Sequence, residues 1–403
     1  MPTPASSIEP SEPVATGAVA AQYLATFLKP EMLHIYRQIT ALREFRPLVL
    51  CQKRENSDAF PFDNIRVLPK ARTRAWRRFW QKQLLKRPIT IYRSEARRID
   101  LILREARAQV LHIYFGHMGV HLLPLLEITR VPAIVSFHGA DLGIDVDQPA
   151  HLALTRRMFE RATLLLARSE SLAQKLAALG ADSAKIRLHR TGIPLGEIPF
   201  QQRVPPADGA WRCLQACRLI PKKGLTTTIR AFAEFAREYP KATLVIAGEG
   251  PQLEELRVLT RKFGLENRVE FTGFLPQTEL RALYARTHFF LHPSETANDG
   301  DVEGVPNSML EAMASGLPVL ATLHGGIPEA VERGTSGWLV AERDYAGLAH
   351  ALLTLARTES HYSKMSAAAA ARVSALFDLT NQARTLEGYY REAISLAAKE
   401  LPK

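Results

Sequence analysis

Short apolar runs alternate with stretches of helical periodicity along most of the chain, a pattern typical of α/β proteins with parallel sheets. In the first half this pattern predicts strands at 110–115, 133–137 and 162–167, and helices at 119–129, 148–161 and 169–179. Residues 17–30 carry only a weak strand signal.

The alternation stops between residues 200 and 209, where Pro, Gly and polar residues indicate a linker. It then restarts, with strands expected at 211–217, 242–247, 269–271, 289–292 and 318–321, and helices at 224–238, 251–264, 277–285, 306–314 and 328–333. Two successive stretches of alternating strands and helices predict two Rossmann-like domains, 1–203 and 204–403, with parallel sheets that face each other across a cleft. The last predicted helix, about 380–398, is a candidate to pack back on the first domain. Ligands of such sheets bind beyond the carboxyl ends of the strands, so the cleft is the expected site.

Composition agrees with two globular domains and points to the cytoplasm. The chain has 403 residues, of which 46% are hydrophobic and 23% charged. Its three cysteines cannot build a disulfide framework, as expected in a reducing compartment. We find no apolar run of about 18 residues that would span a membrane, and no basic start followed by a long apolar stretch.

The net charge of +11 is concentrated in one segment, residues 70–107, which holds 13 basic and 3 acidic side chains. Within it Trp76, Phe79, Trp80 and Leu84 recur at helical spacing. A basic helix with an aromatic stripe suits an anionic membrane surface, here the inner face of the cytoplasmic membrane. The alternative is a stripe packed on its own domain beneath a solvated basic face. No nucleic-acid-binding motif accompanies the charge, so nucleic acid is not an expected partner.

The most informative segment runs from Asp299 to Leu320. Pro306 suits the first turn of a helix, whose free backbone N–H groups and dipole favour a bound anion. Glu303 precedes this helix and Glu311 lies on it. Carboxylates so placed can accept hydrogen bonds from the hydroxyls of a sugar and of a ribose, with phosphates near the helix start.

This segment resembles the Glu-x7-Glu motif of the retaining glycosyltransferase family 4, in the branch that builds colanic acid and similar exopolysaccharides. Other motifs in matching order are 136–141 (Ser-Phe-His-Gly-Ala-Asp), 191–194 (Thr-Gly-Ile-Pro), 218–224 (Arg-Leu-Ile-Pro-Lys-Lys-Gly), 247–251 (Ala-Gly-Glu-Gly-Pro) and 322–329 (Thr-Leu-His-Gly-Gly-Ile-Pro-Glu). The resemblance covers about residues 110–375 and implies the GT-B fold.

The resemblance and the chemistry of phosphate together assign site residues. Arg218 and Lys223 are expected to stabilise the charge that develops on a departing nucleoside diphosphate. Glu303 would hold the sugar and Glu311 the ribose. The family's matching histidine contacts the transferred sugar, which implies that role for His138, from the opposite domain. Further expected donor contacts are Gly139, Gly224, Gly250, Pro306, Asn307 and Ser308.

We expect no cofactor and no metal. Asp299-Gly-Asp301 resembles the Asp-x-Asp metal site of the other major glycosyltransferase fold, but here cations at 218 and 223 already serve the phosphate. Gly248-Glu-Gly250 lacks the third glycine of a dinucleotide fingerprint, which argues against an NAD enzyme.

The prediction is a metal-independent, retaining hexosyltransferase that moves a hexose from a nucleotide-diphosphate sugar to a glycan or lipid-linked acceptor in polysaccharide biosynthesis. Two alternatives stay open: a nucleotide-sugar epimerase of the same fold, and a non-catalytic nucleotide-sugar-binding relative. The nucleotide base (UDP, GDP or ADP), the hexose, the acceptor and the oligomeric state do not follow from the sequence.

Overall fold

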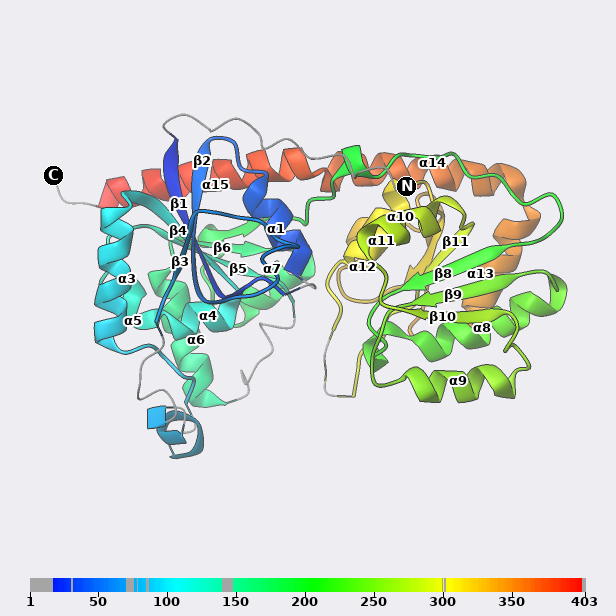
Figure 1. Cartoon of the computed structure of the whole chain (residues 1–403), viewed down its shortest axis with the longest axis horizontal. Helices are drawn as coiled ribbons and strands as arrows, with labels where there is room; N and C mark the ends of the chain where they lie inside the picture. The colour runs from blue at the N-terminus through cyan, green and yellow to red at the C-terminus, as the bar shows by residue number, and fades with distance from the viewer. Residues whose placement is uncertain are drawn as a thin grey trace, which may run out of the picture.

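The computed structural model describes residues 17–29, 32–69, 76–77, 79–84, 87–139, 148–298, 300 and 302–400. It contains two α/β domains, each built on one parallel sheet, which lie next to each other along the long axis of the molecule (Figure 1).

The first domain has a seven-stranded sheet in the order β3-β2-β1-β4-β5-β6-β7, with every pairing parallel. Its strands are β1 (Ala18–Phe27), β2 (Phe45–Arg54), β3 (Ile65–Val67), β4 (Ala108–Tyr114), β5 (Ala133–Phe137), β6 (Leu164–Ala167) and β7 (Ile186–Leu188). Its helices are α1 (Leu33–Thr40), α3 (Arg93–Glu105), α4 (Gly116–His121), α5 (Leu123–Leu126), α6 (Pro149–Arg161) and α7 (Glu170–Ala178).

The weak strand signal at 17–30 corresponds to the ten-residue β1, which lies between β2 and β4 and is mostly buried. Four of its ten residues are alanines, which have a low preference for strands. Burial on both faces of a parallel sheet overrides that preference here. The single predicted helix 119–129 is wrong in detail, because the chain forms two shorter helices, α4 and α5, that meet at Leu122.

The second domain has a six-stranded sheet in the order β10-β9-β8-β11-β12-β13, again with every pairing parallel. Its strands are β8 (Arg212–Ala216), β9 (Thr243–Ala247), β10 (Val269–Gly273), β11 (Phe289–His292), β12 (Val319–Thr322) and β13 (Trp338–Val340). Its helices are α8 (Leu225–Glu238), α9 (Leu253–Lys262), α10 (Gln277–Ala285), α11 (Asn307–Ala314), α12 (Ile327–Ala330), α13 (Tyr345–Arg357) and α14 (Glu359–Phe377). The predicted helix 328–333 is therefore too long, since α12 ends at Ala330.

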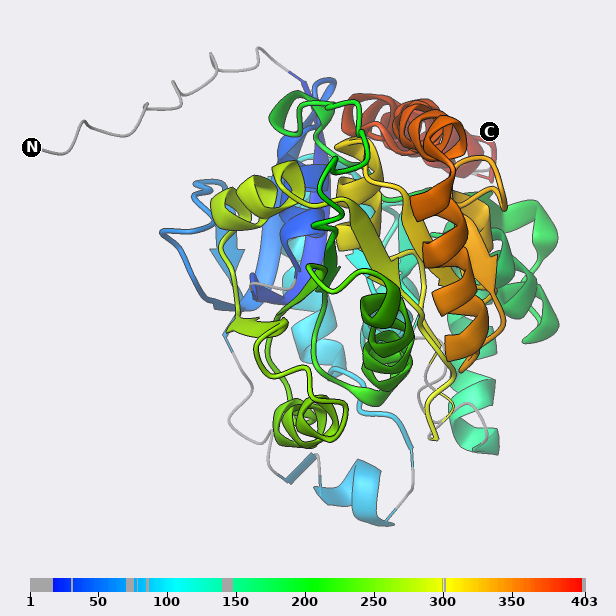
Figure 2. The ribbon, with the colours of Figure 1, turned by 90° about the vertical axis from the view of Figure 1, so that its right-hand side faces the viewer.

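The last helix, α15 (Leu379–Glu400), continues from α14 along one side of the molecule and packs on the first domain (Figures 1 and 2). Leu386, Tyr390 and Ala393 share a buried cluster with residues of β1, β4, β5 and β6. The Glu387 carboxylate accepts hydrogen bonds from the backbone N–H groups of Arg43 and Glu44, both at 2.6 Å. The C-terminal helix is thus an integral part of the first domain.

Two chain segments connect the domains and lie side by side. The Ile193 N–H donates to the Phe377 carbonyl at 2.6 Å, and the Leu379 N–H donates to the Ile193 carbonyl at 3.0 Å. Further along the linker, the buried Arg203 guanidinium donates to the carbonyls of Ala285 (2.7 Å) and Ser315 (2.9 Å), at the ends of α10 and α11. Arg203 thereby anchors the linker to the second domain.

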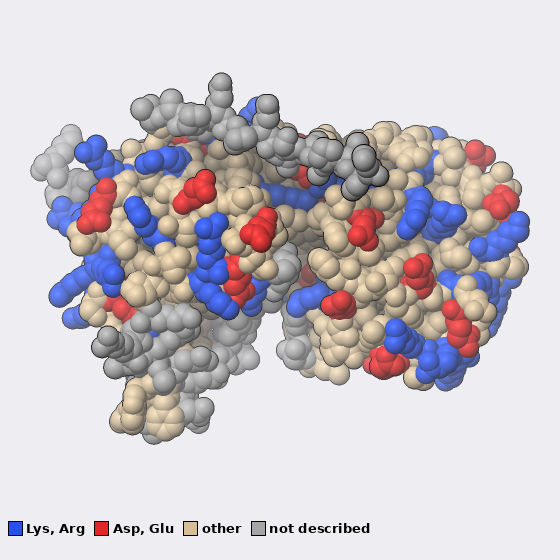
Figure 3. Space-filling model, in the orientation of Figure 1, with Lys and Arg blue, Asp and Glu red and all other residues tan. Residues whose placement is uncertain are grey.

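The strand order of each sheet reverses once, between β1 and β4 in the first and between β8 and β11 in the second. Loops at the carboxyl ends of such strands form the usual ligand site. The loops after β5 and β11 approach each other, since a Cβ built on Gly304 would lie 3.6 Å from the His138 carbonyl oxygen. A groove separates the two domains on the face shown in Figure 3.

Among the described helices, none combines the length and the apolar character that crossing a bilayer requires.

Candidate active site

Lys223 and Glu303 form an ion pair at the carboxyl ends of β8 and β11. Only 11% of the Lys223 side chain and 13% of the Glu303 side chain are exposed. Burial by itself would raise the pKa of Glu303, but the Lys223 ammonium, then His292 and Lys222, favour the carboxylate and lower that pKa to about 2. Two groups predicted to bind the donor thus come together from sequence positions 80 residues apart.

Two glycines give the Lys223 loop its shape. Gly224 has a φ of +60° at the start of α8, and a Cβ there would lie 1.8 Å from the Pro293 carbonyl oxygen. Any side chain at this position would force the loop away from the segment that follows β11. Gly250 also packs closely on the loop after β8, because its Cβ would lie 2.4 Å from the Leu219 carbonyl oxygen. The exposed Arg218 lies in that loop.

The start of α11 lies next to the end of β8. Pro306 occupies the position before the helix, and Asn307 is its first residue. The Ser308 hydroxyl donates to the carbonyl of Ala216 at 2.7 Å, which fastens the helix start to the carboxyl edge of the sheet. The backbone N–H groups of this helix start are therefore near the Arg218–Lys223 loop, as the sequence predicts.

Glu311, on the same helix, contacts the other domain. Its Oε1 lies 2.7 Å from Nη1 of Arg37, on α1, and the Tyr284 hydroxyl lies 3.4 Å from its Oε2. Only 2% of Glu311 and 9% of Arg37 are exposed. The sequence does not suggest this contact, because the partners are 274 residues apart and neither belongs to a shared motif.

His138 follows β5 and lies across the groove from the Glu303 loop. Its Nε2 is 3.1 Å from the Ser136 hydroxyl. Burial, and then the Arg168 guanidinium, lower the pKa of His138 well below its usual value, so the imidazole is neutral near pH 7. A Cβ on Gly139, whose φ is +119°, would lie 4.0 Å from the Gly304 nitrogen. Two glycines, one from each domain, therefore face each other next to His138.

The backbone of Glu303 is held by a histidine to which the sequence assigns no role. The Glu303 N–H donates to Nε2 of His324 at 2.9 Å, and the opposite ring nitrogen lies 2.6 Å from Glu342 Oε1. The only signal in the sequence is that His324 belongs to the 322–329 motif.

The two aspartates of the Asp-x-Asp segment, Asp299 and Asp301, and also Asp141 lie outside the described residues. Within the part of the chain that the structure describes, no group of three or more His, Cys, Asp or Glu side chains is arranged to hold a metal ion.

Comparison with known proteins places both halves of the chain in glycosyltransferase families. Residues 30–192 match the family described as a glycosyl transferase 4-like domain, and residues 199–372 match glycosyl transferases group 1. WcaL of Escherichia coli (strain K12), assigned as a colanic acid biosynthesis glycosyltransferase, is 34% identical over 289 residues, or 70% of each chain. The amylovoran biosynthesis glycosyltransferase AmsK of Erwinia amylovora is 34% identical over 273 residues, or 67% of each chain.

Solved structures resemble the whole molecule. Anabaena HepE in complex with UDP has a TM-score of 0.74 at 19% identity, with 93% of this chain and 100% of that chain covered. A sucrose-phosphate synthase from Thermosynechococcus elongatus has a TM-score of 0.71 at 18% identity, with 94% of this chain and 100% of that chain covered. The two facing parallel sheets confirm the predicted GT-B fold. The chain belongs to the family 4 glycosyltransferases, with colanic acid and amylovoran biosynthesis enzymes among its relatives.

Proposed function

We propose that this glycosyltransferase transfers a hexose from a nucleotide-diphosphate sugar, with retention of configuration and without a metal ion, to a glycan or lipid-linked acceptor in exopolysaccharide biosynthesis. The observation that carries the proposal is the buried Lys223–Glu303 pair at the switch point of the second sheet. It provides a cation for a diphosphate and, next to it, a carboxylate for sugar hydroxyls.

Relatives and structural neighbours support the nucleotide-sugar donor and the pathway. HepE has been solved with UDP and with UDP-glucose, and WcaL and AmsK are named for colanic acid and amylovoran biosynthesis. The chemistry of the groove agrees with these ligands, because it combines basic, carboxylate and imidazole groups from both domains.

Each side chain then has a role. Lys223 and Arg218 stabilise the negative charge that grows on the departing diphosphate. Glu303 remains ionised and accepts hydrogen bonds from the sugar, while neutral His138 contacts the sugar from the first domain. Glu311 binds the ribose once Arg37 has moved away. Closure of the two domains excludes the water that would otherwise hydrolyse the donor.

The test is transfer by purified protein, measured with a panel of nucleotide sugars and an exopolysaccharide-type acceptor. Lys223→Ala and Glu303→Ala should each lower kcat/KM by at least about 100-fold, the loss typical of a group that stabilises transition-state charge. Lys262→Ala, an exposed lysine of α9, is the matched control. Near-normal transfer by both site variants would refute the assignment.

Separate measurements test the stereochemistry, the metal independence and the two alternative functions. An NMR spectrum of the product reports the anomeric configuration, and activity in EDTA tests metal independence. Conversion of the donor without acceptor would indicate an epimerase, and donor binding without turnover a binding protein.

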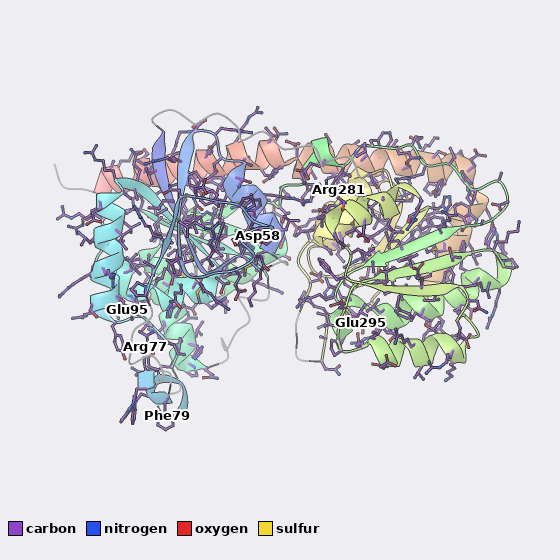
Figure 4. All side chains as sticks on the ribbon, in the orientation of Figure 1. Asp58, Arg77, Phe79, Glu95, Arg281 and Glu295 are labelled. Carbon is purple, nitrogen blue, oxygen red and sulfur yellow. The ribbon has the colours of Figure 1, made fainter. Side chains whose placement is uncertain are left out.

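We also propose that the first domain contacts an anionic membrane surface at the inner face of the cytoplasmic membrane. Trp76, Phe79 and Trp80 are 67%, 52% and 53% exposed, so at least half of each of these aromatic residues is open to solvent. Their segment projects from the first domain (Figure 4). The buried Arg77 side chain pairs with Glu95 of α3 and so attaches this segment to the first domain.

A further inference from the structure

Three consecutive residues of the loop after β12 contact the backbone of Glu303. The Glu303 N–H donates to Nε2 of His324 at 2.9 Å, and the Gly326 N–H donates to the Glu303 carbonyl at 3.4 Å. Gly325, with a φ of +54°, allows this approach, because a Cβ there would lie 2.0 Å from the Glu303 carbonyl oxygen. Both backbone polar groups of Glu303 therefore have partners in one short loop.

The orientation of the His324 ring follows from its two neighbours. Its Nε2 accepts the Glu303 N–H, so in the neutral ring the proton must be on Nδ1. Nδ1 lies 2.6 Å from Glu342 Oε1 and donates to that carboxylate. A carboxylate that orients an imidazole in this way selects its tautomer as well as its direction.

Glu342 is itself fixed. Its Oε2 accepts the Thr296 N–H at 2.8 Å, and its Oε1 accepts the Thr296 hydroxyl at 3.2 Å. Thr296 lies between β11 and Glu303, so Glu342 is fixed by the same loop whose backbone His324 contacts. His324 is 2% exposed and has both ring nitrogens engaged.

The imidazole contacts the backbone of Glu303 and leaves its carboxylate to Lys223. We infer that His324, oriented by Glu342, is a positioning residue that fixes the Glu303 backbone so that the carboxylate meets both Lys223 and the donor sugar. The inference rests on the proposed role of Glu303 in donor binding.

This role predicts that loss of the imidazole lowers the rate of sugar transfer much more than the affinity for the nucleotide. Without the imidazole the Glu303 loop shifts, and a displacement of about 1 Å at a reacting centre costs about 100-fold in rate. The diphosphate contacts of Arg218 and Lys223 belong to a different loop. His324→Ala should therefore lower kcat about 100-fold, while the Kd of the nucleoside diphosphate alone changes by less than about threefold.

Graded variants test the hydrogen bonds directly. In His324→Gln the amide oxygen can still accept the Glu303 N–H, so it should recover at least about tenfold of the kcat lost in His324→Ala. His324→Asn is too short to reach and should not recover activity. Glu342→Gln keeps an acceptor for Nδ1 but places an amide nitrogen against the Thr296 N–H, so its kcat should lie between that of wild type and that of Glu342→Ala, which should resemble a mild form of His324→Ala. The exposed His350→Ala is the control.

Three outcomes would overturn the inference. They are a folded His324→Ala with kcat within about threefold of wild type, equal kcat in His324→Gln and His324→Asn, and an equal loss of nucleoside diphosphate binding and of kcat. If His324→Ala does not fold, the comparison of Gln with Asn decides. Glu303→Ala is assayed in parallel: if it is as active as wild type the proposed function fails, whereas an inactive Glu303→Ala beside normal His324 variants rejects only this inference.

Discussion

Arg37 of the first domain and Glu311 of the second form a buried ion pair, with 2.7 Å between Nη1 and Oε1. Because Glu311 is only 2% exposed, a ribose can reach its carboxylate only after neighbouring groups move, and Arg37 is the neighbour that belongs to the other domain. With Glu311 as the proposed ribose ligand, the pair would link domain arrangement to access of the donor.

Replacing Arg37 should make donor binding tighter and the free protein less stable. Arg37→Met leaves the Glu311 carboxylate buried without its cation, which should cost about 3 kcal/mol in the free energy of unfolding. Donor hydroxyls would no longer compete with a guanidinium, so the donor Kd should fall about tenfold. Isothermal titration and urea unfolding measure the two effects.

The control for this change is Arg281→Met, at a position labelled in Figure 4. Arg281 pairs with Glu197, whose side chain is 54% exposed, so its loss should alter neither quantity strongly. Weaker donor binding by Arg37→Met would instead show that Arg37 contacts the donor.

The depressed pKa of Glu303 predicts how the protein responds to acid. Its folded pKa of about 2 lies below the ordinary value of 4.5, so the stabilisation from the Lys223 pair is complete above about pH 4.5 and is lost as pH falls towards 2. In Lys223→Met the carboxylate loses its main cation, and its pKa should rise. Unfolding free energies from pH 2 to 7 should then show a smaller decrease on acidification in Lys223→Met than in wild type. Identical pH profiles would contradict the assigned coupling.

Glu329 should hold the two domains together. Its carboxylate oxygens accept the backbone N–H groups of Glu170 (2.8 Å) and Ser171 (3.1 Å), at the start of α7 in the first domain. Glu329→Ala removes both bonds and should shift the open–closed equilibrium towards the open form by about 1.5 kcal/mol. Small-angle X-ray scattering should show a larger radius of gyration than for wild type. The nearby exposed Glu332→Ala serves as the control, and an unchanged radius would show that this contact does not support closure.

The C-terminal helix should be essential for the stability of the first domain. Glu387 is 1% exposed and accepts the backbone N–H groups of Arg43, Glu44 and Phe45, which lie just before β2 and at its first residue, so Glu387→Ala leaves these donors without their acceptor. We expect a loss of about 3 kcal/mol in the free energy of unfolding, measured in urea. Lys399→Ala, at an exposed position of the same helix, should change it by less than about 0.5 kcal/mol. Equal stability of the two variants would argue against the anchoring role.

The projecting aromatic segment should bind vesicles that contain anionic lipid. Binding should weaken as salt is raised, since basic side chains near such a surface contribute about 1 kcal/mol each and are screened by ions. The triple change Trp76→Ser, Phe79→Ser and Trp80→Ser should reduce binding, whereas Phe274→Ser, at a 63% exposed aromatic of the second domain, should not. Sedimentation with phosphatidylcholine and phosphatidylglycerol vesicles measures this. Equal binding to neutral vesicles would remove the electrostatic part of the proposal, and no binding would remove all of it.

Much of the second domain could be predicted from the chain, because its strands are short apolar runs separated by helices of clear periodicity. Less of the first domain could be predicted. The local sequence does not reveal the burial of the alanine-rich β1 or of the unpredicted α1, β2 and α3. β1 becomes a central strand because β2 and β4 pair with it on either side. That is a property of the assembled sheet and not of the segment.

The sequence by itself determined the local devices of this protein: a glycine at 224 where the backbone has a positive φ, a proline before the helix of Glu311, and the charged residues that match a glycosyltransferase motif. These depend on a few neighbouring residues, and neighbouring residues leave a readable pattern. Only the tertiary structure decided the partners of those charges. Arg37 meets Glu311, and His324 meets the Glu303 backbone, because domain packing and loop closure bring distant segments within hydrogen-bonding distance. No local preference along the chain encodes such a pair.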